Sequence, residues 1–167
     1  ENNNYTSFSV VRYGNVMGSR GSVIPFFLNQ EKNKKFTITD KRMTRFMITL
    51  DQAIDLVKFA FKDSLGGEIY ISKIPSMKII DIAKAINNKN EIVFIGIRPG
   101  EKFHEVMISK EDSLNTFEYK HYYKIIPFNK NKKYIKSGKK VPLERASVWF
   151  DDKGQYVPPR EECCVIM

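Results

Sequence analysis

The sequence predicts an α/β fold with a largely parallel sheet, and three observations support this class. Short apolar runs rich in β-branched and aromatic residues alternate along the chain with segments of helical periodicity. Such alternation is typical of strand–helix units that build parallel sheets. The chain has 167 residues, of which 42% are hydrophobic, and it carries no internal repeat. In this fold class, ligands bind beyond the carboxyl ends of the strands.

The first predicted elements are a strand over residues 6–13, a helix over 22–31 and a strand over 36–40. The segment before the helix is β-branched and aromatic enough to form a buried strand. Ser22 stands immediately before the first apolar residue of the helix, where a serine side chain serves as N-cap. The order is therefore strand, helix, strand.

A strongly amphipathic helix is predicted over residues 50–61, because apolar residues recur there at helical spacing. Thr49 is placed to cap its start, and Gly66 with Gly67 is a typical stop signal. An apolar run over residues 68–72 then predicts the next strand.

Two further elements follow, a helix over residues 76–87 with Ser76 as its cap and a strand over 91–97. Beyond residue 112 the pattern weakens into sequence rich in tyrosine, phenylalanine, lysine and proline, with one extended run over 117–127. The prediction is a body over residues 1–112 and an extended tail or oligomer arm over 113–167.

A glycine-rich loop over residues 12–22 follows the first predicted strand. Glycines let the backbone turn and approach a ligand closely, and Arg20 adds a forked cation that pairs with phosphate oxygens. Ser22 adds a neutral donor or caps the helix. The residues alone leave two interpretations open, a loop that binds a phosphorylated ligand and an ordinary turn. The three glycines are Gly14, Gly18 and Gly21.

Two more arginine-bearing segments have similar ambiguity. Residues 40–46 place two arginines and a threonine between a strand and a helix, which suits a diphosphate or an exposed basic turn equally. Residues 97–102 follow an apolar strand, and Pro-Gly there makes a tight turn that brings Arg98 and Glu101 together. That pair is either a weak surface ion pair or a clamp for phosphate and ribose hydroxyls.

The net charge of +9 invites comparison with nucleic-acid binding proteins. Many of the lysines lie in clusters near residues 32–35, 130–133 and 136–140, which are typical of a solvated face. The arginines occupy loops of the ligand-binding type instead. We therefore expect no nucleic-acid partner, and a positive field that attracts an anionic small molecule such as a nucleotide diphosphate.

Several familiar chemistries are absent from the 167 residues: there is no Gly-x-Gly-x-x-Gly, no Walker loop, no zinc-like Cys/His spacing and no Gly-x-Ser-x-Gly elbow. His104 and His121 are far apart and have no nucleophile beside them, so His104 is interpreted as a helix-surface or hydrogen-bonding residue. No catalytic residue and no metal ligand is predicted. Cys163 and Cys164 are adjacent, so no disulfide framework is expected, which favours a reducing, cytoplasmic location.

Four motifs occur in a specific order along the chain. They are Arg12-Tyr13-Gly14-Asn15-Val16 with Gly18-Ser19-Arg20-Gly21-Ser22-Val23-Ile24-Pro25, then Arg42-Met43-Thr44-Arg45-Phe46, Lys73-Ile74-Pro75-Ser76-Met77-Lys78 and Gly96-Ile97-Arg98-Pro99-Gly100-Glu101-Lys102. Together they resemble the carboxyl-terminal half of extended short-chain dehydrogenase/reductases, and most closely the configuration-inverting UDP-N-acetylglucosamine 4,6-dehydratases that start pseudaminic acid synthesis. The resemblance covers about residues 5–112. It implies a Rossmann-like parallel sheet with a small substrate-binding α/β subdomain.

The resemblance implies roles for residues of the glycine-rich loop. Tyr13 would line the nicotinamide cofactor, and Asn15 would contact the nucleotide sugar. The family's pocket for the diphosphate and uracil is shaped at positions that correspond here to Arg20, Ser22 and Pro25. The implied cofactor is NADP or NAD.

Three further roles follow from the same resemblance. Arg45 matches the arginine that grips the diphosphate, and Arg98 with Glu101 matches the element that reaches phosphate and ribose. The implied reaction oxidises C4 of the sugar, eliminates water across C5 and C6, and returns the hydride to C6 with inversion at C5. A C4 ketone acidifies the C5 proton, so a side-chain base removes it near neutral pH.

The family's dinucleotide loop and Tyr-x-x-x-Lys pair precede the strand that begins near Phe8, and neither occurs in this sequence. We therefore expect the chain to be a fragment that binds the UDP-sugar, shows no turnover alone, and becomes a homo-oligomer at full length. A UDP-sugar 4-epimerase or related dehydratase is the nearest alternative. A non-catalytic basic or lipid-anchored binding module is another.

The last four residues, from Cys164 to Met167, match the C-a-a-X pattern for prenylation. Such a short pattern arises easily by chance, and the enzymes that the chain resembles are cytosolic bacterial proteins. Contact with a membrane is expected only if Cys164 is prenylated.

Overall fold

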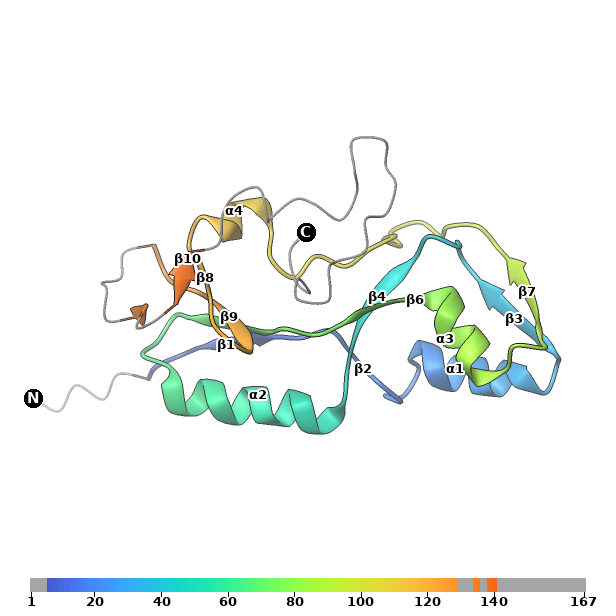
Figure 1. Cartoon of the computed structure of the whole chain (residues 1–167), viewed down its shortest axis with the longest axis horizontal. Coiled ribbons are helices and arrows are strands. Elements are labelled where there is room, and N and C mark those ends of the chain that lie inside the picture. The colour runs from blue at the N-terminus through green and yellow to red at the C-terminus, as the bar shows by residue number, and fades with distance from the viewer. Residues whose placement is uncertain (1–5, 129–133, 136–137, 141–167) are drawn as a thin grey trace, which may run out of the picture. The chain divides into compact units, whose positions relative to one another are not determined.

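The computed structural model describes residues 6–128, 134–135 and 138–140, and the α/β class predicted from the sequence is confirmed (Figure 1). The described chain forms two compact units. The first unit contains residues 6–13, 51–73 and the described residues from 106 onward, and the second contains 14–50 and 74–105. Each unit has its own strands and its own apolar core, so each is described separately.

The first unit is built on a five-stranded mixed sheet in the order β1-β5-β9-β8-β10. Strands β1 and β5 are parallel, with Val11 opposite Tyr70, and the remaining neighbours are antiparallel. The strands are β1 Val10–Arg12, β5 Ile69–Ser72, β8 Thr116–Glu118, β9 Tyr122–Ile125 and β10 Lys139–Lys140.

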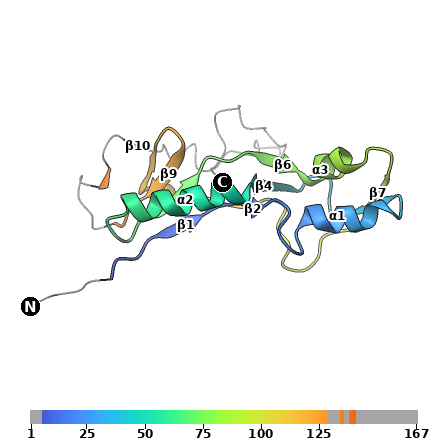
Figure 2. The same ribbon diagram turned by 90° about the horizontal axis from the view of Figure 1, so that it is seen from below.

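Helix α2 (Leu50–Asp63) lies along one face of this sheet, beside β1 and β5 in both views (Figures 1 and 2). Its buried Leu56 and Ala60 pack against Tyr70, which is what the amphipathic pattern predicts. The helix ends before Gly66 and Gly67, both with positive φ, so the glycine stop signal is confirmed.

A buried ion pair closes the same unit. The Lys124 ammonium, only 1% exposed, contacts the Asp63 carboxylate at 2.5 Å, and the Tyr70 hydroxyl donates to the same carboxylate oxygen at 3.0 Å. Because the ammonium is fully desolvated, the carboxylate offsets the cost of burying it. The pair ties the end of α2 to β9.

The second unit contains two small sheets and two helices. Strand β4 (Thr44–Ile48) pairs in parallel with β2 (Asn15–Val16) and antiparallel with β6 (Ser76–Lys78). Strands β3 (Lys35–Ile38) and β7 (Glu91–Phe94) form a parallel pair. The helices are α1 (Val23–Glu31) and α3 (Ile79–Ile86).

Aromatic and aliphatic side chains of α1, α3 and β3 form the core of the second unit. Phe27 of α1 and Phe36 of β3 are 1% and 0% exposed, with ring centroids 5.3 Å apart. Ile82 and Ala83 of α3 pack into the same cluster. This packing fixes the first turn of α1 relative to the end of β3.

One prediction about local structure is wrong, and one strand was not predicted. The prediction of a helix over 76–87 capped by Ser76 fails because Ser76–Lys78 is strand β6, paired with β4, and α3 starts only at Ile79. Strand β4 was itself not predicted. Its burial is continuous apart from Arg45, so it lacks the alternation that identifies a half-buried strand.

The predicted boundary at residue 112 does not match the division of the described chain either. Residues of β8 and β9 pair with each other, and β9 pairs with β5, so this stretch belongs to the sheet of the first unit. The predicted extended run over 117–127 is thus part of a sheet rather than an arm. The rest of the predicted tail, with Cys164, lies largely outside the described residues.

Helix α4 (Lys110–Ser113) belongs to the first unit, and Ser109 and Asp112 form a full capping box at its start. Arg12 of β1 donates to the Met107 carbonyl and to the Asp112 carboxylate, which holds this segment against the sheet. Among the residues that the structure describes, no helix has the length and apolar character needed to cross a membrane.

Candidate functional site

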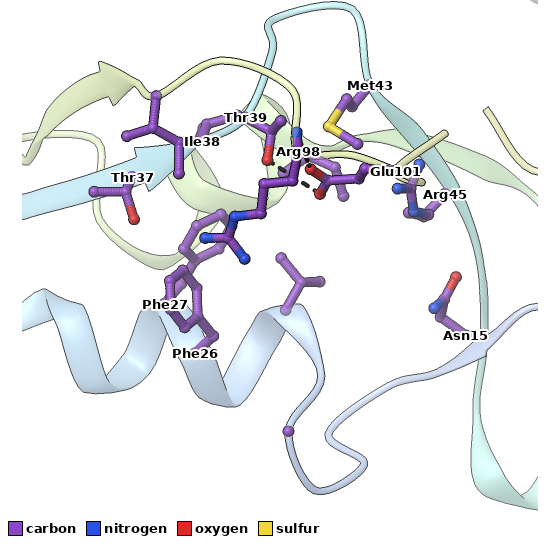
Figure 3. A pocket seen from close by; sticks show the side chains of 14 residues that line it. Asn15, Phe26, Phe27, Thr37, Ile38, Thr39, Met43, Arg45, Arg98 and Glu101 are labelled. Atoms are coloured by element: carbon purple, nitrogen blue, oxygen red, sulfur yellow. Dashed lines mark hydrogen bonds between the residues drawn. The ribbon is translucent and has the colours of Figure 1, made fainter. Parts of the chain in front are cut away.

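A pocket of about 280 Å³ lies in the second unit, at the carboxyl ends of the parallel strands β3 and β7. Its wall combines Thr39 after β3, the first turns of α1, and residues of the loop after β7 (Figure 3). Parallel strands direct ligands to this edge. The volume is close to the lower end of the range of roughly 300–1,000 Å³ that is usual for small-molecule sites.

The structure brings four predicted residues from separate parts of the sequence to this pocket. Asn15 comes from β2, Arg45 from β4, and Arg98 with Glu101 from the loop after β7. Figure 3 shows Arg98 and Glu101 on the loop above α1, with Arg45 and Asn15 farther along the pocket.

Arg98 stands at the start of a tight turn. The Glu101 N–H donates to the Arg98 carbonyl at 3.1 Å, and Gly100 has φ 81°, as the third position of a type II turn requires. The turn predicted from Pro-Gly is therefore present. The Arg98 guanidinium lines the pocket and has no hydrogen-bond or ion-pair partner among the described residues.

Glu101 has a different environment from that expected of an Arg–Glu ion pair. One carboxylate oxygen accepts from the Thr39 hydroxyl at 3.2 Å, and the other accepts from the Arg98 backbone N–H at 3.2 Å. Its contact with Arg98 is therefore with the backbone, not with the guanidinium. The carboxylate joins the turn to the end of β3.

Arg45 directs its guanidinium mainly at backbone carbonyls. Nη1 donates to Thr44 O at 2.7 Å and to Phe103 O at 3.0 Å, and Nη2 donates to Lys102 O at 3.0 Å. Nε lies 3.6 Å from a Glu105 carboxylate oxygen. The carbonyl contacts use three of the five N–H groups of the side chain in hydrogen bonds, and Nε faces the Glu105 carboxylate beyond hydrogen-bond distance.

Asn15 reaches the pocket because the chain passes very close to β4 at the preceding residue. A Cβ at Gly14 would stand 2.4 Å from Phe46 O and 2.6 Å from Phe46 Cβ, so only glycine fits. The next two residues pair with β4, and Met17 N donates to Ile48 O at 2.9 Å. The glycine thus sets the position of Asn15.

Three predicted residues do not line the pocket. Arg20 is exposed in the loop, Ser22 is the N-cap residue of α1, and Pro25 is the third residue of that helix, while Gly21 and Val23 do line it. The Ser22 hydroxyl makes no capping bond and has no partner in the described structure, although the atom is buried. Of the three arginines to which the resemblance gives a role at the diphosphate, Arg45 and Arg98 line this pocket and Arg20 does not.

Tyr13, the residue predicted to meet the cofactor, belongs to the first unit and is 41% exposed. The pocket lies wholly within the second unit.

Sequence reasoning missed Thr39 and Met43, both of which line the pocket. Thr39 had a usable signal, because it stands at the carboxyl end of a predicted strand, where ligands of parallel sheets bind. Met43 had none, since a methionine between two arginines is indistinguishable from a residue of an exposed turn.

His104 is placed by a hydrogen bond rather than on a helix surface. Its Nδ1 lies 2.7 Å from the hydroxyl of the buried Thr44. Burial lowers the pKa of His104, and the positive charges of Arg45 and Arg42 lower it further. The ring is thus held neutral, as a hydrogen-bonding residue that supports the loop.

Asp40 and Arg42 form an exposed turn next to this region. The Arg42 guanidinium makes two hydrogen bonds of 2.9 Å to the Asp40 carboxylate and lies 4.3 Å from the centroid of the Phe103 ring. The side-chain bond to Arg42 lowers the pKa of Asp40 to about 2. No group of three or more residues suited to hold a metal ion occurs in the described part of the chain.

Comparison with known proteins gives matching sequences and a matching structure. The chain is 54% identical over 127 residues to the inverting UDP-N-acetylglucosamine 4,6-dehydratase of Campylobacter jejuni, covering 75% of this chain and 38% of that protein. It is 44% identical over 147 residues to the UDP-glucose 4-epimerase of Rickettsia bellii, covering 83% and 43%. The X-ray structure of Pen from Bacillus thuringiensis matches with a TM-score of 0.67 and 44% identity, over 72% of this chain and 40% of that one.

The chain therefore spans about two fifths of the length of these relatives. The sequence pattern of a family described as polysaccharide biosynthesis protein matches residues 1–127, which is most of the chain. The relatives of the chain include a nucleotide-sugar 4,6-dehydratase and a 4-epimerase. Together with the α/β fold, these matches show that the chain belongs to this polysaccharide biosynthesis family.

Proposed function

We propose that this chain is the substrate-binding portion of a UDP-N-acetylglucosamine 4,6-dehydratase that inverts C5 and serves the synthesis of pseudaminic acid-type glycans. The observation that carries the proposal is the Arg98 guanidinium, a permanent cation that lines the pocket with no partner of its own among the described residues. The high identity to the Campylobacter dehydratase supports the choice of reaction.

The pocket offers two sources of positive potential to a diphosphate. Arg98 supplies a forked cation whose hydrogen bonds to phosphate are charge-assisted. The amino-terminal end of α1 supplies the second source, because the N–H groups of Val23 and Ile24 have no acceptor within the helix. Pro25 has no N–H and instead presets the backbone of the first turn.

The other predicted residues would complete the nucleotide-sugar site. Asn15 would donate to the sugar, and Arg45 retains one N–H for an oxygen of the ligand beyond its carbonyl contacts. Glu101 would accept a ribose hydroxyl if it exchanges its bond with Thr39. Arg20 and Ser22 flank the pocket at the start of α1 and would act on the outer part of the ligand.

The proposed enzyme depends on NADP or NAD, which accepts and returns a hydride in this family of reactions. Apart from the proposed contact of Tyr13, the 167 residues contain no Gly-x-Gly-x-x-Gly loop that would cradle the dinucleotide. We propose that the cofactor is held mainly by polypeptide outside these 167 residues and that the 167 residues alone have no turnover.

A titration with UDP tests the proposal directly. The chain should bind UDP, and Arg98→Ala should weaken binding by about tenfold to a hundredfold, because a hydrogen bond to a charged group contributes about 1.5–3 kcal/mol. Lys41→Ala is the matched control, since it removes an exposed cation that does not line the pocket. Absence of UDP binding, or equal losses in the two variants, would contradict the proposal.

A UDP-sugar 4-epimerase is the second candidate, because the Rickettsia epimerases match over 147 residues and therefore over more of the chain than the dehydratases do. A chimera of the Campylobacter dehydratase that carries residues 6–127 of this chain would separate the two functions. Formation of a 4-keto-6-deoxy sugar from UDP-N-acetylglucosamine supports the dehydratase, and formation of the 4-epimer alone supports the epimerase.

A further inference from the structure

We propose that residues 134–140 form a strap that closes over strand β8 and, by holding the Tyr119 ring in place, keeps water away from the buried pair of Lys124 and Asp63. The strap consists of the residues of this stretch that the structure describes, 134–135 and 138–140. The inference concerns the first unit alone and does not rest on the function proposed for the pocket.

The first argument concerns the walls around the Lys124 ammonium. The side chain is only 1% exposed, although lysines are almost never fully buried unless they are paired. The ammonium lies 5.0 Å from the centroid of the Tyr70 ring and 5.5 Å from that of the Tyr119 ring, within the range of cation–π attraction. Tyr70 belongs to β5 and is 0% exposed, so it is a fixed wall. Tyr119 follows β8 and is half-buried, so it is the wall that can move.

The second argument is that the strap holds the Tyr119 ring in two ways. The Tyr119 hydroxyl donates to the Ile135 carbonyl, which also accepts from Gly138 N at 3.0 Å. Gly138 packs directly on the ring, since a Cβ there would stand 2.6 Å from Tyr119 Cζ and 2.8 Å from the hydroxyl oxygen. The φ of Gly138 is not positive, so the contact with the ring, rather than the backbone conformation, is what requires glycine at this position.

The third argument is that β10 fastens the strap to the sheet. Strand β10 pairs antiparallel with β8, and Lys140 lies opposite Phe117 (Figure 1). Phe117 in turn lies opposite Lys124 of β9. The strap is therefore attached beside the strand that carries the buried ammonium. Release of the strap would free the Tyr119 ring and open a path for water to Lys124.

Chemical labelling of lysines tests the strap. N-hydroxysuccinimide acetate acylates exposed lysines, and mass spectrometry of the digested chain gives the rate at each position. Lys124 should react only when its surroundings open, so its rate follows the population of the open state. Lys58 of α2 is exposed and serves as the internal reference. In the wild-type chain, Lys124 should react far more slowly than Lys58.

Two variants loosen the strap without removing the ring that covers Lys124. Tyr119→Phe deletes the hydroxyl that bonds to Ile135 and should raise the labelling rate of Lys124 about fivefold, as the loss of one neutral hydrogen bond implies. Gly138→Ala inserts a methyl group against the ring and should raise the rate about tenfold or more. Gly18→Ala makes the same change where nothing lies within 4 Å of the new Cβ, and should leave Lys124 at the wild-type rate.

Wild-type labelling of Lys124 in both Tyr119→Phe and Gly138→Ala would overturn the proposal. If Gly138→Ala loses the circular dichroism of the folded chain, the variant has unfolded and Tyr119→Phe decides the question. The measurement uses no nucleotide, so its outcome is independent of whether the chain binds UDP.

Discussion

Replacement of Gly14 by alanine is expected to damage both the stability of the second unit and the position of Asn15. The added Cβ would lie 2.4 Å from the Phe46 carbonyl oxygen and 2.8 Å from its carbonyl carbon. Both are backbone atoms of strand β4, so no flexible side chain is available to move aside. The short strand β2 therefore has to retreat from β4.

The size of the effect follows from that retreat. An ordinary contact between carbon and oxygen is about 3.3 Å, so the strands must separate by roughly 0.9 Å, within the range in which overpacking costs about 1–3 kcal/mol. The 2.9 Å bond from Met17 N to Ile48 O would then exceed hydrogen-bonding distance. Each lost bond costs about 1 kcal/mol, so we expect a total destabilisation of about 2–4 kcal/mol.

Urea unfolding followed by circular dichroism measures this loss, and UDP titration measures the displacement of Asn15. Gly18→Ala is the matched control, because nothing lies within 4 Å of its new Cβ although its φ of 74° disfavours alanine. That backbone strain costs about 1–2 kcal/mol. If Gly14→Ala is no less stable than Gly18→Ala and binds UDP as the wild type does, the close approach to Phe46 is not what fixes Asn15.

Three other outcomes are expected. Asp63→Ala should lose about 3–5 kcal/mol of stability, because it leaves the Lys124 ammonium buried at 1% exposure without its carboxylate. Lys124→Met should lose clearly less, because the Asp63 carboxylate is 12% exposed and keeps its hydrogen bond from the Tyr70 hydroxyl, and similar losses in chemical denaturation would refute this. Asp40 should titrate near pH 2 by NMR, and its midpoint should shift toward 3.8 in Arg42→Ala. The contribution of Asp40 to stability is therefore present above about pH 3.8 and disappears as the pH falls toward 2. A midpoint that does not shift in the variant would disprove the role of Arg42. His104 should titrate below pH 6.5 by NMR. As the pH falls, the unfolded chain then takes up the proton first, so stability decreases below pH 6.5. A midpoint above 6.5 would show that burial does not control the pKa of the imidazole.

The elements that sequence patterns predict well are those whose signals are local. Helix α2 was predicted by its apolar spacing and the glycines that end it, and α1 was predicted almost to the residue. Strand β4 was missed because a strand buried on both faces has no alternation, and Arg45 together with the preceding Arg42 made the segment resemble an exposed turn. Ser76 looked like a helix cap, but its pairing with β4 depends on a strand that was itself not predicted.

For the candidate site, the sequence predicted four of the residues that line the pocket, but not the contacts that each of them makes. Arg98 and Glu101 were placed in one turn from Pro-Gly, and that turn is present. The bond from Thr39 to Glu101 joins residues 62 positions apart, and those from Arg45 to the carbonyls of the loop span nearly as many. Such contacts depend on how strands are arranged in space, and no local pattern encodes them.

The crystal structure of this chain with UDP is the most direct test of the nucleotide-sugar assignment. The account predicts that the diphosphate lies in the pocket between α1 and the loop after β7, with phosphate oxygens about 2.7–2.9 Å from the Arg98 guanidinium nitrogens. UDP bound at another surface, with the Arg98 side chain turned away from it, would contradict the central claim.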